Sequence, residues 1–299
     1  MMKKNKYYPT AKSYFSGAGG LDCGIRETGI KIVQSYEIDE KCIDVLQRNF
    51  NHEIISTDVR NITVLDQPKT DVMFGTFPCT KYSPIADISG TRTGDELFLH
   101  MFRHIALERP EVYVIENVPG MKKFPIVMEA MSKIPDYYVQ IFCPLKTSTW
   151  LPQRRERLIL IGSKKPMNIT PPIGTKPVRL KDIMESNPDM KIPKYVLSRL
   201  NGDYRDKPII SDPNDINAIA PTCVAHYAKD IGTRMVKDKK HPLGVRPYTT
   251  KEWARLQGFP DSFDWGTAGD RDIYRMVGNA VPVPMARWIG ENIVKYFNT

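Results

Sequence analysis

A cysteine follows a proline at the end of a short apolar run, in a position where it can act as a nucleophile. The run extends from Asp71 to Phe77 and leads directly into Pro78 and Cys79. A thiol placed where a strand gives way to a loop is presented rather than packed, and its thiolate form attacks electrophilic carbons. The sequence therefore indicates covalent catalysis by Cys79. The other cysteines, at 23, 42, 143 and 223, are expected to be small apolar residues of the interior.

Acidic and basic groups flank two further apolar runs. Glu116 follows residues 112–115, and Arg155 and Arg157 precede residues 158–161. A carboxylate can transfer a proton, and guanidinium groups can polarise a carbonyl oxygen or bind an anion. Ligands of open α/β sheets bind at the carboxyl ends of the strands, so we expect these groups to meet Cys79 at one edge of a sheet.

Alternating apolar runs and helical patterns predict the elements that position these groups. The expected strands are 13–16, 32–37, 54–58, 72–77, 112–116, 138–142 and 158–162, and the expected helices are 21–28, 40–50, 97–109 and 126–134. This alternation predicts an α/β fold with a mostly parallel sheet covered on both faces. Residues 164–245 are polar and rich in proline and lysine, with one helix expected near 180–184. We expect a second, smaller, irregular or β-rich domain there, and a C-terminal helix after about residue 272 that packs back on the first.

A glycine-rich run, Phe-Ser-Gly-Ala-Gly-Gly-Leu-Asp at 15–22, follows the first expected strand. Glycines there let the backbone approach a ligand. Asp22 stands where a dinucleotide-binding loop has its third glycine, and it would repel a pyrophosphate at the helix N-terminus. Glu37, at the end of the second strand, can bind ribose hydroxyls, and Asp58 can accept a hydrogen bond from an adenine amine. Together they favour S-adenosylmethionine, a cationic nucleoside, over a nicotinamide dinucleotide.

Several short motifs occur along the chain in a fixed order. They are the glycine run at 15–21, Tyr-Glu-Ile-Asp at 36–39, Pro-Cys at 78–79, Glu-Asn-Val at 116–118, Gln-Arg-Arg-Glu-Arg at 153–157, the block at 246–260 and Gly-Asn-Ala-Val at 278–281. The set resembles that of the DNA (cytosine-5) methyltransferases, most closely the small prokaryotic or phage type. The resemblance covers nearly the whole chain except about 165–240. It implies a Rossmann-like seven-stranded methyltransferase sheet in a catalytic domain (1–163 plus 272–299) and a target-recognition domain (164–271).

The resemblance also implies a chemistry. Cys79 would add to C6 of a cytosine flipped out of duplex DNA, so that C5 can take the methyl group of S-adenosylmethionine. Glu116 would bind N3 and the exocyclic amine as a general acid, Arg157 would polarise O2, and Arg155 would hold the ring, Glu116 or a phosphate. The cofactor pocket would be lined by Phe15, Gly17, Gly19, Leu21, Glu37, Ile38, Asp58, Val59, Pro78, Leu97 and Asn279.

Contacts with DNA are expected from two regions. Ser83 and Arg92 lie in a segment rich in Thr, Ser and Gly that would close over the extruded base. Thr222 resembles a recognition-domain threonine that contacts the backbone near the target, and basic residues between 234 and 246 would bind phosphates. Thr80 stands where the family usually has glutamine, which bears on how the orphan base is held.

Composition restricts the class of protein further. The chain is 41% hydrophobic and 26% charged, as in globular proteins, and its net charge of +9 favours a polyanionic partner. The scattered, odd number of cysteines argues against a disulfide framework and a structural zinc site, and we expect no metal. No apolar stretch suggests a secretory signal or a membrane span. We expect a cytoplasmic, nucleoid-associated monomer that acts on double-stranded DNA, with any cognate restriction endonuclease acting separately.

Two alternatives remain open. A tRNA cytosine-5 methyltransferase would use the same chemistry on RNA, although the Cys-Phe-Thr motif of that branch does not occur in this chain. A non-catalytic DNA-binding relative would keep the fold, but the presence of Cys79, Glu116 and Arg157 speaks against it. Methyl transfer to DNA and to tRNA distinguishes these possibilities.

Overall fold

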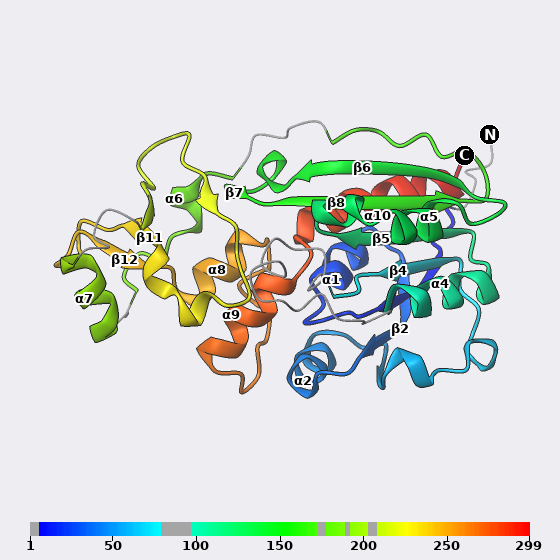
Figure 1. Cartoon of the computed structure of the whole chain (residues 1–299), viewed down its shortest axis with the longest axis horizontal. Coiled ribbons are helices and arrows are strands. Elements are labelled where there is room, and N and C mark those ends of the chain that lie inside the picture. Colours follow the sequence, from blue (N-terminus) through cyan, green and yellow to red (C-terminus); the bar gives the residue numbers. More distant parts are fainter. Residues whose placement is uncertain (1–5, 79–96, 173–177, 189–191, 203–207) are drawn as a thin grey trace. The chain divides into compact units, whose positions relative to one another are not determined.

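The computed structural model of the chain describes residues 6–78, 97–172, 178–188, 192–202 and 208–299. Contacts between residues divide the chain into two compact units. Unit 1 comprises Met1–Lys146, Glu156–Pro172 and Val283–Thr299, and unit 2 comprises Thr147–Arg155 and Ile173–Pro282. The chain therefore leaves unit 1 twice and returns to it twice, and its last helix belongs to unit 1 (Figure 1).

Unit 1 is built on a seven-stranded sheet. Its strands are β1 (Thr10–Tyr14), β2 (Lys31–Glu37), β3 (Glu53–Ser56), β4 (Val72–Gly75), β5 (Val112–Asn117), β6 (Tyr138–Lys146) and β8 (Glu156–Ser163). Their order in the sheet is β3-β2-β1-β4-β5-β8-β6. Strands β1 to β5 pair in parallel, whereas β8 runs antiparallel to β5 and β6. β4 and β5 are buried along their whole length, as expected for strands covered on both faces.

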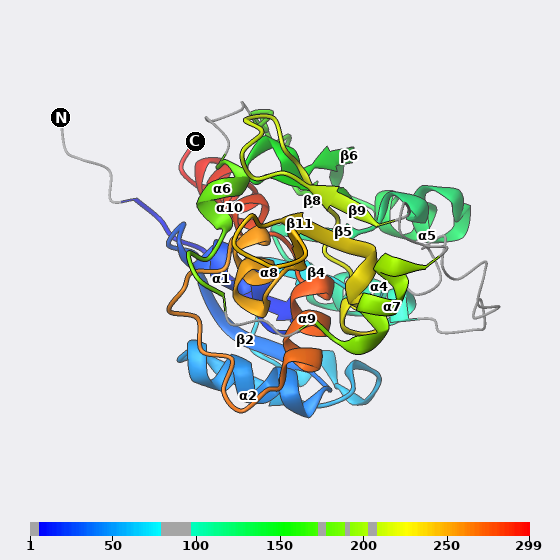
Figure 2. The ribbon, with the colours of Figure 1, turned by 90° about the vertical axis from the view of Figure 1, so that its left-hand side faces the viewer.

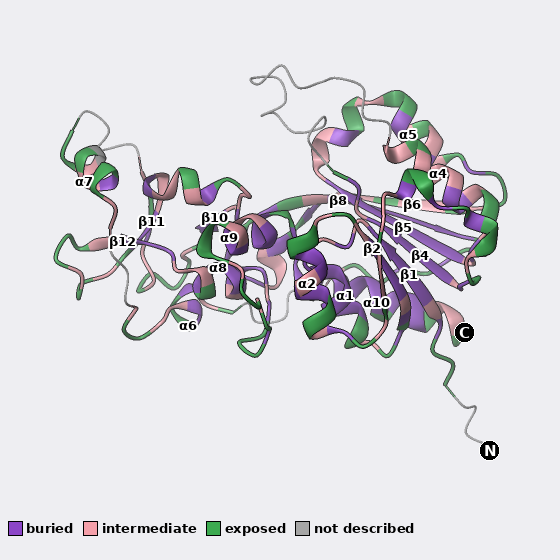
Figure 3. Cartoon of the chain, turned by 90° about the horizontal axis from the view of Figure 1, so that it is seen from below, coloured by how far each residue is buried: buried purple, intermediate pink, exposed green. Residues whose placement is uncertain are grey.

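Helices cover both faces of this sheet (Figure 3). α1 (Gly20–Arg26), α2 (Glu40–Asn49) and α10 (Val283–Phe297) lie on one face, and α4 (Leu97–Glu108) and α5 (Pro125–Ser132) lie on the other. α1 and α10 meet at Gly24, where an added Cβ would lie 2.2 Å from the carbonyl oxygen of Val283. Glycine permits this approach, which brings the C-terminal helix against the first helix of the chain.

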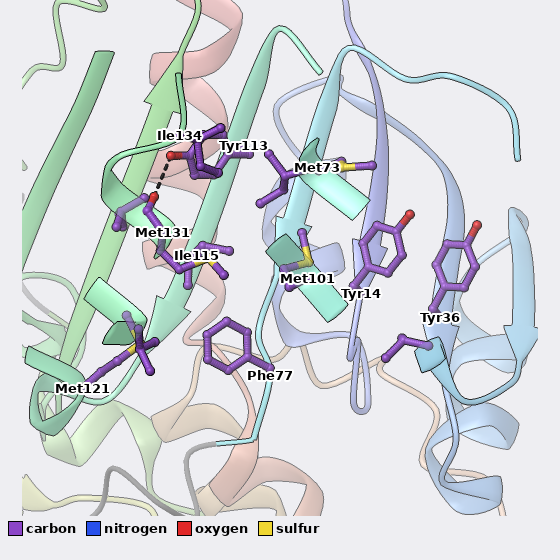
Figure 4. Packing of buried hydrophobic residues seen from close by; sticks show 14 of the residues in the cluster. Tyr14, Tyr36, Met73, Phe77, Met101, Tyr113, Ile115, Met121, Met131 and Ile134 are labelled. Carbon is purple, nitrogen blue, oxygen red and sulfur yellow. Dashed lines mark hydrogen bonds between the residues drawn. The ribbon is translucent and has the colours of Figure 1, made fainter. Parts of the chain in front are cut away.

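The main hydrophobic cluster lies between the sheet and helices α4 and α5 (Figure 4). Tyr14 and Tyr36 stack with their ring centroids 4.5 Å apart, and Tyr113 donates its hydroxyl to the carbonyl of Met131 at 2.6 Å. Phe77 belongs to the same cluster and is 3% exposed. The chain that leaves β4 is therefore anchored in the core immediately before Pro78.

Unit 2 combines short strands with helices (Figure 2). Its elements are β7 (Gln153–Arg154), α6 (Leu180–Ile183), α7 (Lys194–Asn201), β9 (Ile209–Ser211), β10 (Ala220–Pro221), β11 (Arg234–Lys237), β12 (Val245–Pro247), α8 (Thr250–Leu256) and α9 (Asp270–Asn279). β7 pairs with β10, and β11 pairs with both β9 and β12. Trp253 of α8 stacks on Tyr227 at 4.1 Å and meets Tyr274 of α9 edge-on, so aromatic rings hold the core of this unit.

The predicted α/β fold with a seven-stranded sheet is confirmed. The C-terminal helix α10 belongs to unit 1, whereas α9, which the predicted catalytic domain largely includes, belongs to unit 2. Pro282 separates these helices, since proline does not continue a helix. The bounds of the functional domains stay a prediction. Along the parts of the chain that the structure describes, no helix has the length and apolar character needed to cross a bilayer.

Candidate active site

The carboxyl ends of the parallel strands form one edge of unit 1, and most of the predicted site residues lie there. β1 and β4 are neighbours, and the strands that follow them, β2 and β5, lie on opposite sides of this pair. Such a switch in strand order is where open α/β sheets bind their ligands. Tyr14 is paired with Gly75, so the next residues, Phe15 and Thr76, both lie at this point of the edge.

The loop after β1 uses left-handed backbone conformations. The angle φ is +61° at Phe15, +55° at Gly17 and +84° at Gly19. A Cβ added at Gly19 would lie 2.5 Å from the ring of Phe50, whereas one added at Gly17 would meet no described atom within 4 Å. Gly19 is therefore required for packing, while Gly17 borders open space in which a ligand can approach the main chain.

Glu37 ends β2 and ties the glycine loop to this strand. Its Oε2 accepts a hydrogen bond from the amide of Gly17 at 2.7 Å. Its Oε1 accepts bonds from the amides of Ile38 and Asp39 at 2.8 and 2.9 Å. A carboxylate has about four acceptor positions. Three main-chain donors therefore leave capacity for one more donor, and ribose binding by Glu37 stays a prediction.

The side chain of Asp22 points into the interior of the protein, whereas the sequence predicted that it faces the ligand. Its carboxylate is fully buried and accepts hydrogen bonds of 2.6 Å from the hydroxyls of Ser13 and Ser35. The Nε2 of His52 lies 2.7 Å from the same Ser35 hydroxyl. Burial raises the pKa of Asp22 and lowers the pKa of His52. The carboxylate therefore does not face a ligand at the loop, and Asp22 does not distinguish a pyrophosphate from S-adenosylmethionine there.

Asp22 should instead anchor α1 to β1 and β2. We expect Asp22→Ala to lower the free energy of unfolding by about 2–4 kcal/mol, because two buried hydroxyls lose their acceptor. Urea unfolding of the purified protein measures this loss. Asp44→Ala removes an exposed pair with Arg48 and is the matched control, expected to change the value by less than about 0.5 kcal/mol. Equal losses in the two variants would contradict the anchoring role.

The chain that leaves β4 is held from two sides. Thr76 donates its hydroxyl to the carbonyl of Phe15 at 2.9 Å, and Asn117 Nδ2 donates to the carbonyl of Phe77 at 3.0 Å. The rings of Phe15 and Phe77 meet edge to face, with centroids 6.3 Å apart. Asn117 was not among the predicted site residues, although its place directly after Glu116 at a strand end was an available signal. The glycine loop and the chain that leads to the predicted nucleophile are thus fixed to each other.

The predicted nucleophile and two predicted DNA contacts lie outside the described residues. These are Cys79, Ser83 and Arg92, together with Thr80. Pro78, the last described residue before this segment, is exposed. Their roles therefore remain predictions, and the structure fixes the chain that enters this region.

Glu116 and Arg157 form an ion pair at the same edge of unit 1. The Nε of Arg157 lies 2.8 Å from Oε1 of Glu116, and their side chains are 12% and 9% exposed. The antiparallel register explains the contact, because Glu116 lies opposite Ile159 and Arg157 is the diagonal neighbour on the same face. A shielded carboxylate beside a fixed guanidinium can bind adjacent donor and acceptor groups of a heterocyclic ring.

The other cofactor residues predicted in unit 1 differ in exposure. Ile38 is 64% exposed beside the glycine loop. Asp58 binds the guanidinium of Arg60 through both carboxylate oxygens, and these hydrogen bonds lower the pKa of Asp58. An adenine amine must therefore share Asp58 with Arg60. The apolar members are buried or half-buried: Leu21, Val59 and Leu97.

The remaining predicted residues, Arg155, Thr222 and Asn279, belong to unit 2. Arg155 is buried, and its guanidinium donates to three main-chain carbonyls. The hydroxyl of Thr222 donates to the carbonyl of Arg154. Asn279 is exposed at the end of α9. Arg155 and Thr222 are thus engaged within unit 2, in contacts that the sequence did not predict.

Part of the basic cluster predicted at 234–246 is also engaged within unit 2. Arg246 is 2% exposed and pairs with Asp238 and Glu252, each at 2.7 Å. Lys237 pairs with Asp212 at 3.0 Å. The prediction of phosphate binding is wrong for Arg246, because its guanidinium is enclosed between two carboxylates.

A family model matches almost the whole chain. Residues 10–295 match the family described as C-5 cytosine-specific DNA methylase. The chain is 28% identical to the Type II methyltransferase M.Bsp6I of Bacillus sp. (strain RFL6), over 95% of this chain and 98% of that protein. It is 29% identical to the Type II methyltransferase M.NlaX of Neisseria lactamica, over 93% of this chain and 94% of that protein.

Solved structures show the same fold. The Entamoeba histolytica methyltransferase EhMeth superposes with a TM-score of 0.81 at 20% identity, covering 97% of this chain and 99% of that one. The Dnmt2 methyltransferase of S. pombe superposes with a TM-score of 0.79 at 18% identity, covering 97% and 100%. At these identities the likeness concerns the fold, and it confirms the predicted methyltransferase type of sheet.

Proposed function

The chain belongs to the C-5 cytosine-specific DNA methylase family, and from this premise we propose that it methylates C5 of a cytosine flipped out of duplex DNA. The methyl donor is S-adenosylmethionine, and the reaction passes through a covalent bond between Cys79 and C6. The observation that carries the proposal is the shielded pair of Glu116 and Arg157. This pair lies at the end of β5, beside the strand whose chain leads into Pro78 and Cys79.

Covalent catalysis overcomes the weak nucleophilicity of C5. The Cys79 thiolate forms a bond to C6, and the electrons of the C5–C6 double bond are accommodated in the ring while Glu116 gives a proton to N3. C5 then forms a bond to the methyl carbon as the bond from this carbon to the sulfonium sulfur breaks, so that the sulfur leaves as a neutral thioether. A base then takes the C5 proton, elimination of the thiolate restores the double bond, and the N3 proton returns to Glu116. Arg157 polarises O2 and holds Glu116 in place.

The residues around the glycine loop fit the proposed cofactor. S-adenosylmethionine supplies an electrophilic methyl group when bound. Gly17 borders open space, and Glu37 retains acceptor capacity for ribose hydroxyls. The exposed side chain of Ile38 offers an apolar surface to the adenine. By resemblance to the family, we also assign Asn279 to the cofactor-binding residues.

Methyl transfer from tritiated S-adenosylmethionine tests the proposal. We expect label in duplex DNA, no label in tRNA, and a covalent adduct with DNA that contains 5-fluorocytosine. Label in tRNA with none in DNA would instead identify a tRNA enzyme. Neither label nor adduct, with DNA binding intact, would identify a non-catalytic relative. Bisulfite sequencing of DNA from an expressing host then gives the target sequence.

We extend the proposal to the organisation of the protein. Unit 1 carries out the chemistry, and unit 2 recognises the target. Two of its relatives are named as Type II methyltransferases. On that basis we propose that the chain acts in a restriction-modification system as a cytoplasmic monomer, with any endonuclease acting as a separate protein.

A further inference from the structure

Three side chains of unit 2 form a buried polar group, which we call the Gln153–Arg155–Gln257 cluster. Arg155 is 1% exposed, and both glutamines are fully buried. Burying a guanidinium is unfavourable unless its donors find acceptors. The groups that accept hydrogen bonds from these side chains therefore indicate the role of the cluster.

The guanidinium of Arg155 joins two segments that are far apart in the sequence. Nη1 donates to the carbonyl of Cys223 at 2.8 Å. Nη2 donates to the carbonyls of Gly278 and Ala280 at 3.0 and 2.8 Å. Arginine suits this arrangement, because its planar fork holds several donors in fixed directions.

The two glutamines complete the same arrangement. Nε2 of Gln257 donates to the carbonyls of Val277 and Ala280, both at 2.9 Å. Gln153 donates to Oε1 of Gln257 at 2.9 Å and accepts a bond of 3.0 Å from the amide of Cys223. The last carbonyls of a helix have no partner within the helix. The cluster therefore caps the C-terminal end of α9.

The joined segments touch directly at Gly278. A Cβ added at this residue would lie 2.3 Å from the nitrogen of Ala225 and 2.4 Å from the carbonyl carbon of Val224. Both are main-chain atoms, which cannot turn aside as the end of a flexible side chain can. The end of α9 and the segment after β10 are thus locked together by contact and by shared hydrogen bonds.

Each locked segment carries one predicted ligand-binding residue: Asn279 for the cofactor and Thr222 for the DNA backbone. Asn279 is exposed, although its neighbours Gly278 and Ala280 are both buried. Thr222 directly precedes Cys223 and donates its hydroxyl to the carbonyl of Arg154. The cluster binds the main-chain carbonyls of Gly278 and Ala280, on either side of Asn279, and the side chain of Asn279 lies at the surface.

We propose that the Gln153–Arg155–Gln257 cluster positions Asn279 and Thr222, and that Arg155 acts through the main chain rather than on the cytosine. The inference rests on the proposed function. It replaces the catalytic role predicted for Arg155, because the guanidinium is enclosed among main-chain carbonyls of unit 2. Arg155 is thus a positioning residue, and Gln257 shares its carbonyl partner at Ala280.

Arg155→Lys and Gln257→Met test the inference. Lysine keeps the charge but has no planar fork to bridge two segments, and methionine keeps the length of glutamine without its amide. Each variant should raise the dissociation constants of S-adenosylmethionine and of duplex DNA by roughly tenfold, the effect of about one lost hydrogen bond. Isothermal titration calorimetry measures both constants. The rate of 5-fluorocytosine adduct formation at saturating ligands should change much less.

Lys251→Gln is the control, because Lys251 is an exposed residue of α8 that pairs with Asp261. It should bind both ligands like the wild-type protein, and circular dichroism checks the fold of every variant. Wild-type binding by Gln257→Met would overturn the proposal, whether or not Arg155→Lys folds. The proposal would also be overturned if Arg155→Lys lost adduct formation but still bound S-adenosylmethionine and DNA like the wild-type protein. That result is expected of a group that touches the cytosine. A wild-type protein that binds both ligands without transferring a methyl group would refute the proposed function alone.

Discussion

Cys79→Ala should abolish methyl transfer and lower kcat by on the order of 10⁴-fold or more. Such a loss corresponds to an activation barrier that is higher by at least about 5.4 kcal/mol. Without a thiolate at C6, C5 of cytosine is too weak a nucleophile to take a methyl group. Single-turnover transfer of tritiated methyl groups measures the loss. The covalent adduct with 5-fluorocytosine DNA should disappear on a denaturing gel, whereas binding of S-adenosylmethionine should stay at the wild-type value.

Cys143→Ser is the matched control for this experiment. Cys143 is half-buried in unit 1, and burial raises the pKa of its thiol. Burial also raises the pKa of Cys23 to about 11. Such thiols stay protonated near neutral pH and are poor nucleophiles. Cys143→Ser should keep wild-type activity, and adduct formation by Cys79→Ala would contradict the assignment of the nucleophile.

The sheet of unit 1 was predictable because its buried strands are apolar runs that end in chemically distinctive residues. Glu37 ends β2, and β5 ends one residue beyond Glu116. β6 was predicted too short, because Pro144 interrupts its apolar pattern. The pairing with β8 shifts register between Phe142 and Leu145 and then resumes. A proline cannot donate to the ladder, yet a strand can continue beyond it at such an irregularity.

Unit 2 was harder to predict, because its polar composition hides the helical periodicity. α8 does carry a local signal, since Thr249 and Glu252 form a capping box at its start. The buried arginines carry no such signal. Arg155 binds the carbonyls of Cys223 and Gly278, which only the folded chain brings near it.

The sequence also did not predict the direction in which some side chains point. Asp22 was expected to face the ligand, because it lies in the first turn of α1 beside the glycine loop. Successive residues of a helix point to different faces, so proximity in sequence does not say which face a carboxylate takes. Ser13 and Ser35 supply the hydroxyls that hold it inside. Only the packing of α1 on β1 and β2 shows this.

Glu116→Gln should lower kcat by about 10²–10⁴-fold, the usual contribution of a positioned acid or base. Glutamine keeps the size of the side chain and its hydrogen bonds to a ring, but it cannot give a proton to N3. Because Glu116 lies outside the glycine loop, the dissociation constant of S-adenosylmethionine should not change. Single-turnover methyl transfer and calorimetry separate the two effects. A loss of cofactor binding as large as the loss of rate would contradict a role confined to the cytosine.

The ion pair with Arg157 makes a stronger test possible through a double-mutant cycle. If Glu116 and Arg157 grip one ring as a unit, Arg157→Gln alone should already remove most of the rate, and adding Glu116→Gln should cost little more. Arg109→Gln breaks the exposed pair with Asp136 in the same unit and should leave the rate unchanged. Additive losses at Glu116 and Arg157 would mean that the two groups act independently. Because their contact is nearly shielded from water, non-additive losses are the expected result.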